Sequence, residues 1–416
     1  MVNVCLACVF LFIGLLVAVY ITHNDSIVNP EPDKEKFEIL TKSEDLSIVE
    51  GMKLVSLGNL VKYNNNLYIA GIKQDSLDIY CCRYADDNNF TLLETAYVGN
   101  CYVYDSDHTR PEVFIDNEKI HIVTCYRSSV QYFSSQQVVN MSFSGGKIPF
   151  IDSWTFSYPH MFTDKQDKLH MVVRAQIYIQ VPGSITYKKG VMIISETDHG
   201  WKLNYKTTIF EGFEYFDSVF DKDNELLYIS CVGNRTEDGL SERRQGCYFA
   251  YTRDFGETWF SANDTSITFP ELIYYGYTSR CNVEFDDKLN PIVAISYCCY
   301  GIERDTIIMT WSNGWKTVHI NPEKGYTKVL EPQSYYYLGK CYVFLWITEK
   351  LEFSYQEPYN ITIFSSAYPP ETFKMENFTI PNSTYSKYTF NKQYVYIKTS
   401  VTYNGTYNVW KVIINE

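Results

Sequence analysis

Residues 248–260 read YFAYTRDFGETWF, and this stretch has the spacing of a tight corner between two β-strands. Its pattern is Ser/Thr-x-Asp-x-Gly-x-Thr-Trp, formed by Thr252, Asp254, Gly256, Thr258 and Trp259. An aspartate at this place accepts hydrogen bonds from the amides of its own turn, and a glycine adopts a positive φ without a Cβ penalty. The Thr–Trp pair favours a following strand, with the indole packed under the turn. The stretch therefore predicts an outer hairpin corner.

A hairpin unit recurs along the chain on both sides of this corner. Each unit is a strand, a polar turn and a second strand of bulky apolar residues, which is the sequence signal of a β-hairpin. The copies span residues 58–72, 110–126, 158–174, 215–232, 280–297, 333–347 and 385–397. After each of the first six we expect a second polar corner, near residues 86–88, 144–146, 197–200, 254–256, 312–314 and 368–370.

Each copy of the repeat contains four expected strands and no helical periodicity. The repeat therefore predicts an all-β fold, a β-propeller of four-stranded blades. The repeat count gives seven blades. A six-bladed propeller is the alternative, and a pair of β-sandwiches is the remaining possibility. The seventh blade has three strands in the last part of the chain, so we expect residues 37–40 to supply its fourth strand and close the ring.

The composition limits the class of partner. The chain of 416 residues is 45% hydrophobic and contains 37 Tyr and 25 Phe, which is typical of a globular protein rich in strands. A net charge of −13 without a long run of Lys or Arg argues against nucleic acid. The seven His show no ligand spacing and no phosphate-binding glycine loop is present, so we expect neither a metal nor a cofactor.

Residues 4–21 form an uncharged apolar run. The run is long for the core of a signal peptide and short for a membrane span, so it fits a cleaved signal or a retained signal-anchor. We expect a signal or anchor at residues 1–22, a polar lead-in at 23–50 and the propeller at 51–416. The protein is then secreted or displayed at the cell surface, as a type II membrane protein if the anchor is kept, and contacts the membrane only through this segment.

Sequence motifs and cysteines agree with this export route. Nine Asn-x-Ser/Thr acceptors for N-glycosylation occur, at Asn24, Asn89, Asn140, Asn234, Asn263, Asn360, Asn377, Asn382 and Asn404. Ten cysteines follow the apolar run, and disulfides are the default in an exported chain, with buried thiols as the alternative. Proximity in the sequence suggests three pairs: Cys231 with Cys247, Cys82 (or Cys81) with Cys101, and Cys281 with Cys298 (or Cys299).

The corner at residues 252–259 matches the Asp-box, or BNR repeat, of sialidase-type propellers, and residues 195–201 and 310–315 are worn relatives of it. Residues 109–114, TRPEVF, open a hairpin, and the later hairpins lead in order into the corner. On these features the chain resembles the sialidase superfamily, and within it the trans-sialidase-like surface glycoproteins of protozoan parasites. The resemblance is remote and covers residues 56–371.

The resemblance implies a particular catalytic chemistry. A sialidase binds the substrate carboxylate with three arginines, and it uses a tyrosine nucleophile activated by a glutamate with an aspartate as general acid/base. This chain departs from that pattern. The place of the first arginine reads SLGN at residues 56–59, Phe216 occupies the place of the glutamate, and Tyr335 and Tyr336 are displaced from the place of the nucleophile.

Some candidate site residues remain. The catalytic candidates, both beside Phe216, are Glu214 and Asp217. The candidate ligand-binding residues are Arg110, Arg243, Arg244 and Arg280. Because the openings of inner strands face the central channel of a propeller, these arginines can converge on an anionic sugar. The alternatives are a solvated loop for Arg243 and Arg244, and structural ion pairs for Arg110 and Arg280.

The sequence therefore predicts an exported, glycosylated, sialidase-like propeller that binds a glycan or a surface protein and is catalytically degenerate. The preserved turn motif beside lost catalytic positions favours binding over turnover. The alternative is an active exo-sialidase or a related glycosidase with a rearranged site. A coat glycoprotein without a ligand is the third hypothesis.

Overall fold

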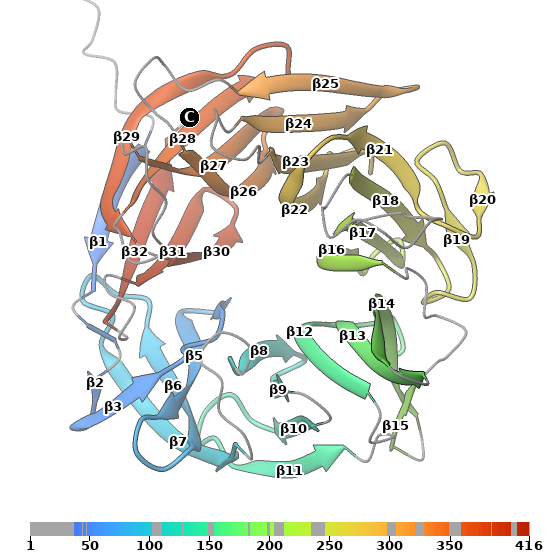
Figure 1. The fold of residues 1–416 in the computed structure, drawn as a ribbon. Coiled ribbons are helices and arrows are strands. Elements are labelled where there is room, and N and C mark those ends of the chain that lie inside the picture. The colour runs from blue at the N-terminus through green and yellow to red at the C-terminus, as the bar shows by residue number, and fades with distance from the viewer. Residues whose placement is uncertain are drawn as a thin grey trace, which may run out of the picture.

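The structure, a computed structural model, describes residues 37–415 apart from 44, 47, 102–109, 127–128, 149–153, 182–183, 198–199, 204–211, 234–245, 298–304, 321–327, 349–358, 384 and 401–405. The described residues form seven antiparallel sheets, arranged as blades around one axis (Figure 1). This confirms the predicted all-β propeller with seven blades built on four strands, and the six-bladed alternative is wrong. Blades 1 and 4 each carry two additional short strands. The same residues contain no helix of the length and hydrophobicity that a membrane span needs. The apolar run at 4–21 lies outside them.

The first three blades follow each other along the chain. Blade 1 contains β2 (Ile48–Val49), β3 (Met52–Val55), β4 (Leu60–Tyr63), β5 (Asn66–Lys73), β6 (Asp78–Ala85) and β7 (Leu92–Asn100). Blade 2 contains β8 (Glu112–Asp116), β9 (Lys119–Tyr126), β10 (Ser129–Ser135) and β11 (Phe143–Ile148). Blade 3 contains β12 (Trp154–Thr163), β13 (Leu169–Val181), β14 (Ser184–Thr197) and β15 (Gly200–Leu203).

The other four blades complete the ring. Blade 4 contains β16 (Phe213–Asp221), β17 (Leu226–Gly233), β18 (Gly246–Thr252), β19 (Trp259–Phe260), β20 (Ser266–Ile267) and β21 (Glu271–Tyr275). Blade 5 contains β22 (Thr278–Phe285), β23 (Pro291–Tyr297), β24 (Thr306–Trp311) and β25 (Trp315–Ile320). Blade 6 contains β26 (Lys328–Tyr337), β27 (Lys340–Thr348), β28 (Tyr359–Ala367) and β29 (Lys374–Ser383). Blade 7 contains β30 (Tyr385–Asn391), β31 (Tyr394–Ser400), β32 (Tyr407–Ile414) and β1 (Phe37–Lys42).

Strand β1 lies in the same sheet as the last strands of the chain. It pairs antiparallel with β32, from Phe37 opposite Ile414 to Lys42 opposite Trp410, and a bulge interrupts the ladder after Ile39. Residues from the two ends of the propeller therefore share one blade, as the neighbouring blue and red strands of Figure 1 show.

The inner hairpins lie where the polar turns predict them, from β4–β5 in blade 1 to β30–β31 in blade 7. One outer corner was predicted wrongly. Residues 144–146 lie inside β11, and the chain turns before that strand instead. The glycine here serves close packing, because a Cβ on Gly145 would lie 2.1 Å from the carbonyl oxygen of Tyr132 on the adjacent strand.

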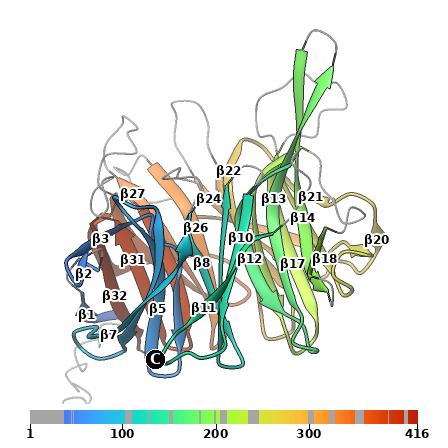
Figure 2. The ribbon, with the colours of Figure 1, turned by 90° about the horizontal axis from the view of Figure 1, so that it is seen from below.

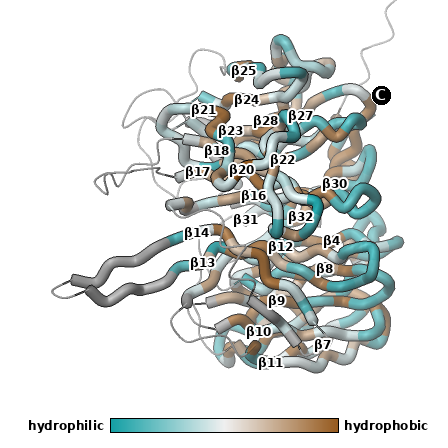
Figure 3. The backbone as a smooth tube through the Cα atoms, turned by 90° about the vertical axis from the view of Figure 1, so that its right-hand side faces the viewer, coloured by the Kyte–Doolittle hydropathy of each residue, from teal (hydrophilic) through white to brown (hydrophobic). Residues whose placement is uncertain are grey.

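The hydrophobic core is divided into clusters, one between each pair of neighbouring blades. Alternate residues of a strand point to opposite faces of its sheet, so one strand contributes to two clusters. In β17, Leu227 and Ile229 face blade 3, whereas Tyr228 and Val232 face blade 5. The strand centres are hydrophobic and the short turns on the right of Figure 3 are largely hydrophilic. Stability therefore comes from packing between blades.

The corner that follows β18 is held by its own side chains. The Asp254 Oδ1 atom accepts hydrogen bonds from the Thr252 hydroxyl and the Thr258 amide, both at 2.8 Å. The Thr252 hydroxyl accepts the Gly256 amide at 2.9 Å, and Gly256 has a φ of +94°. The Trp259 indole is buried and donates to the Gly256 carbonyl at 3.0 Å. The five pattern residues thus form one hydrogen-bonded turn.

The described structure contradicts one of the three predicted cysteine pairs, Cys231 with Cys247. Cys231 faces the core between blades 3 and 4, whereas Cys247 faces the core between blades 4 and 5. Cys82 and Cys101 also belong to different cores, but the alternative partner Cys81 shares the core between blades 1 and 2 with Cys101, so that pairing stays a prediction. The reason is strand alternation, which proximity in the sequence ignores. Cys281 is a buried thiol, and its predicted partner Cys298 lies outside the described residues.

The predicted glycosylation sites are consistent with access from solvent where the structure describes their side chains. The exposed acceptors are Asn89, Asn140, Asn263, Asn360 and Asn377. Asn24, Asn234 and Asn404 lie outside the described residues, as does the side chain of Asn382. Glycosylation and export stay predictions.

We predict that Asp254→Ala lowers the free energy of unfolding by about 1–2 kcal/mol, because the turn loses its central acceptor. Urea unfolding of the folded domain measures this. Ligand affinity of the surviving protein should not change, since the turn lies at the end of blade 4 opposite the beginning of its inner strand. A selective loss of affinity would contradict the assignment of a purely structural role.

Candidate functional site

Four inner strands carry a β-bulge near the end at which each strand begins. The register shifts lie between Ser157 and His160, Phe213 and Tyr215, Thr278 and Arg280, and Leu330 and Gln333. Two of these bulges contain a proline, Pro159 and Pro332, which fits because proline cannot donate a ladder hydrogen bond. A bulge bends a strand and redirects its side chains, and bulges are enriched beside functional sites. Blades 3 to 6 therefore share an irregular rim on one face of the propeller.

Two arginines and two tyrosines meet at this rim, and we call Tyr158, Arg174, Tyr215 and Arg280 the Arg–Tyr cluster. The Arg280 guanidinium lies 3.5 Å from the ring centre of Tyr215. The Arg174 guanidinium lies 4.6 Å from the ring centre of Tyr158 and 5.8 Å from that of Tyr215. The two ring centres are 5.9 Å apart, and all four side chains are half-buried. The cluster joins blades 3, 4 and 5.

The local backbone fixes Tyr158 and Arg174 in place. Tyr158 has a φ of +54°, in the left-handed region that costs a bulky residue roughly 1–3 kcal/mol. Arg174 lies opposite Ser157 in the ladder, and its Nε donates to the Ser157 hydroxyl at 2.8 Å. The sheet thus holds the backbone of Tyr158 in a strained conformation, with the ring of Tyr158 against the oriented guanidinium of Arg174. Strained residues of this kind are concentrated at binding and active sites.

The chemistry of the Arg–Tyr cluster suits an acidic sugar. When an arginine stacks on an aromatic ring, the ring covers the flat face of the guanidinium. The N–H donors point outward in the plane of the guanidinium, and two of them can bind a carboxylate together. The tyrosine rings offer apolar faces and hydroxyls to a sugar ring. The β13–β14 hairpin projects beyond the body of the propeller (Figure 2). Arg174 lies on β13 below the projecting part, so this hairpin borders the cluster.

A polar network connects the inner strands farther from the rim. Asp217 Oδ2 accepts hydrogen bonds from Asn282 Nδ2 at 2.6 Å and from the Val283 amide at 3.0 Å. Asp217 Oδ1 lies 3.6 Å from His160 Nδ1. Desolvation lowers the pKa of His160, and the Asp217 carboxylate opposes that shift. Asn282 Oδ1 in turn accepts the Ser334 amide at 2.8 Å, so the network joins blades 3 to 6.

Glu284 is the most unusual acid of this inner ring. Burial raises its pKa to about 7, and the nearby Asp217 carboxylate adds to that rise. Its Oε1 accepts the Phe285 amide at 3.0 Å. The described residues contain no group of His, Cys, Asp and Glu suited to hold a metal ion.

The predicted site residues have separate locations. Arg280 belongs to the Arg–Tyr cluster, and Asp217 belongs to the inter-blade network. Arg110 is half-buried just before β8, where its charge helps to lower the pKa of Lys398 after the larger effect of burial. Glu214 lies in β16 but its side chain is not described. Arg243 and Arg244 lie outside the described residues, so a convergence of these arginines stays a prediction.

Sequence reasoning missed Arg174 and Tyr158. Arg174 is in the second strand of blade 3, where an arginine resembles any solvated strand residue. One signal was present in the sequence: Pro159 follows Tyr158 inside an expected inner strand, and a proline there indicates a bulge. The bulge brings the two residues together.

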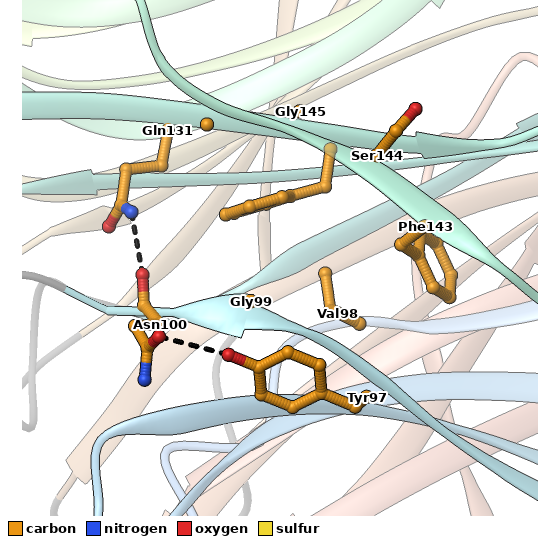
Figure 4. Close-up of a pocket in the computed structure, with 10 residues that line it drawn as sticks. Tyr97, Val98, Gly99, Asn100, Gln131, Phe143, Ser144 and Gly145 are labelled. Atoms are coloured by element: carbon orange, nitrogen blue, oxygen red, sulfur yellow. Dashed lines mark hydrogen bonds between the residues drawn. The ribbon is translucent and has the colours of Figure 1, made fainter.

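A groove lies between strands of blades 1 and 2 (Figure 4). Its volume is about 280 Å³, and its lining includes Tyr97, Asn100, Gln131 and Gly145. The Tyr97 hydroxyl donates to Asn100 Oδ1 at 2.9 Å, and Gln131 Nε2 donates to the Asn100 carbonyl at 2.6 Å. No charged side chain lines it, so this groove does not match an anionic ligand.

Comparison with known proteins establishes the fold. No protein-family model matches the chain, and no curated protein matches its sequence. An ulvan lyase of polysaccharide lyase family PL25, solved bound to a GlcA(1-4)Rha3S saccharide, is similar with a TM-score of 0.64 and 11% identity, over 91% of this chain and 95% of that chain. Polysaccharide lyase Uly1 has a TM-score of 0.56 at 11% identity, over 93% and 98% of the two chains. At this identity the likeness shows a shared propeller fold, and the resemblance to sialidases stays a prediction.

We predict that Glu284→Gln stabilises the protein more at high pH than at low pH. The folded pKa of about 7 is above the ordinary value of 4.5, so the folded state keeps a proton that the unfolded state releases. Wild-type stability is therefore lost as the pH rises through about 7, and the variant should gain about 1–3 kcal/mol over wild type between about pH 4 and pH 8.

Urea unfolding at both pH values measures this difference. Glu38→Gln, which changes an exposed carboxylate on β1, is the matched control. An equal effect of Glu284→Gln at both pH values would contradict a pKa of Glu284 that is raised in the folded state.

Proposed function

We propose that the protein is an exported, glycosylated propeller that binds an acidic polysaccharide at the face carrying the Arg–Tyr cluster. The observation that carries this proposal is the meeting of Arg174 and Arg280 at the ring of Tyr215. Two guanidinium groups at one aromatic ring provide bidentate donors for a carboxylate beside an apolar surface for the sugar. The ulvan lyase that shares the fold was solved with a saccharide containing a uronic acid, which supports this class of ligand.

The charge of the whole protein narrows the ligand further. With a net charge of −13, the protein repels a dense polyanion at long range. A local pair of arginines still attracts a single carboxylate at contact distance. The ligand class is therefore a uronate-containing glycan that is held through single carboxylates at the Arg–Tyr cluster, one acidic unit at a time.

We predict that Arg174→Ala and Arg280→Ala each weaken binding of a uronate-containing polysaccharide about 10- to 100-fold, the loss expected for a charge-assisted bidentate contact. Arg174→Lys should restore only part of the affinity because lysine cannot bind bidentately. Calorimetric titration of the folded full chain with oligouronates measures these changes.

Arg253→Ala is the matched control. Arg253 also stacks on aromatic rings of blade 4, 5.3 Å from the centre of Tyr251 and 5.2 Å from that of Phe260, but in the corner after β18. The variant should bind like wild type. Equal losses for Arg253→Ala and Arg280→Ala, or no binding of any oligouronate by wild type, would contradict the proposed site.

The strained position of Tyr158 favours a second candidate function, cleavage of the bound polysaccharide by β-elimination. In that reaction a base removes the proton α to the uronate carboxyl, the glycosidic C–O bond at the β carbon breaks, and an acid protonates the departing oxygen. Arginines that neutralise the carboxylate make the carbon proton acidic enough to remove. Tyr158, held against Arg174 at 4.6 Å, is the residue placed to exchange a proton at the sugar ring.

We predict that, if wild type cleaves an oligouronate, Tyr158→Phe lowers the rate at least about 100-fold while affinity changes less than about threefold, because the ring is kept and the acidic hydroxyl is lost. The ultraviolet absorbance of the conjugated double bond in the product follows the reaction. Retained turnover in Tyr158→Phe rules out this role. If wild type binds the oligouronate but forms no product with a double bond, the lyase activity is contradicted and the binding function is kept.

A further inference from the structure

Two buried thiols face each other between blades 4 and 5. Cys247 on β18 and Cys281 on β22 both belong to the cluster that fills this interface, together with Val232, Phe249 and Val283. Cys281 is the neighbouring group that, after burial, contributes most to raising the pKa of Cys247, so the two thiols lie close together across the interface. Cys247 is fully buried and Cys281 is 9% exposed. They come from different blades, so a bond between them would cross a blade interface.

The other described thiols have different surroundings. Cys231 lies on the opposite face of blade 4 and packs against blade 3. Cys125 lies in the core between blades 2 and 3, and Cys341 in the core between blades 5 and 6. Cys81 and Cys101 also share a core, but both belong to blade 1. Among the described thiols, Cys247 and Cys281 are therefore the pair that shares one core from two different blades.

We propose that Cys247 and Cys281 are a redox site that forms a disulfide joining blade 4 to blade 5. The oxidant is a small-molecule disulfide such as glutathione disulfide. One cysteine thiolate attacks it and releases one reduced thiol, and the second cysteine then attacks the mixed disulfide and releases the other. Two protein S–H bonds are replaced by one protein S–S bond, and the two electrons leave on the two reduced small thiols.

The burial of the pair determines when this bond can form. Burial raises the pKa of Cys247 well above its ordinary value, so the folded protein holds almost no reactive thiolate at neutral pH. Exchange therefore takes place while the chain folds, before blade 5 packs on blade 4. Afterwards the same burial protects the bond from small-molecule reductants.

The bond has a consequence for the rim. Cys281 follows Arg280 directly, and Arg280 contacts Tyr215 of blade 4. A covalent link from β22 to β18 therefore holds the two blades at the interface that this contact spans. The inference is independent of the ligand proposed above, since it concerns the thiols alone.

The test is refolding of the full chain in a glutathione redox buffer, alkylation of remaining thiols, and peptide mapping without reduction. We expect a linked pair of peptides containing Cys247 and Cys281. The melting temperature of the oxidised protein should exceed that of protein refolded with reductant by about 5 °C. Alkylated Cys247 and Cys281 in correctly folded protein, or a link from either to Cys231, would overturn the proposal.

Serine variants provide the matched comparison. Cys247→Ser and Cys281→Ser should each abolish the dependence of the melting temperature on reductant, whereas Cys125→Ser and Cys341→Ser, which also alter buried thiols of blade interfaces, should keep it. The readout is the difference between oxidised and reduced samples of one variant, so a general loss of stability from a buried serine does not affect it. Loss of the difference in all four variants would overturn the proposal as well.

Discussion

A buried lysine joins the last blade of the ring to the first. Lys398 on β31 is 1% exposed, and its Nζ donates to the carbonyl oxygens of Leu57, at 2.5 Å, and Gly58, just before β4. Burial lowers the pKa of this amine well below its ordinary value, yet its hydrogen bonds satisfy it at the place where blade 7 meets blade 1. Gly58 is required there, because a Cβ would lie 1.6 Å from the carbonyl oxygen of Pro111. Blades 7, 1 and 2 thus meet without room for another atom.

The same kind of bond recurs around the inner ring. Asn59 exchanges two hydrogen bonds with the backbone of Val113, at 2.7 and 2.8 Å, and joins blade 1 to blade 2. Asp217 and Asn282 carry the link from blade 4 to blade 6. These polar side chains satisfy backbone groups of the next inner strand, which the hydrophobic clusters between blades cannot do. Asp217 therefore has an architectural role, and its catalytic role stays a prediction.

Sequence patterns predicted what depends on local chemistry. The seven inner hairpins were found because each polar turn is flanked by apolar strands, and the corner at Asp254 because a turn of this kind needs its own acceptor. What was missed depends on long-range geometry. Arg174 and Tyr158 come together through a bulge. Strand alternation places Cys247 in the core that contains Cys281, and Cys231 in a different core. The glycine at 145 indicated a turn by composition, although its role is close approach to a neighbouring strand.

The arrangement separates folding from recognition along the propeller axis. Short polar turns and the corner at Asp254 lie at one end of the strands, and the bulged rim with the Arg–Tyr cluster lies at the other. Tyr158 and Tyr215 of the rim pack against the edges of two inter-blade cores, and this packing offsets the cost of the strained backbone at Tyr158. The net charge of the whole protein and the charge of the Arg–Tyr cluster also act differently on a ligand. Long-range repulsion from an acidic protein is screened beyond about 8–10 Å at physiological salt, whereas a carboxylate in contact with half-buried arginines is screened much less. Selectivity at the rim therefore depends on the placement of single acidic groups along a glycan, and total charge contributes little.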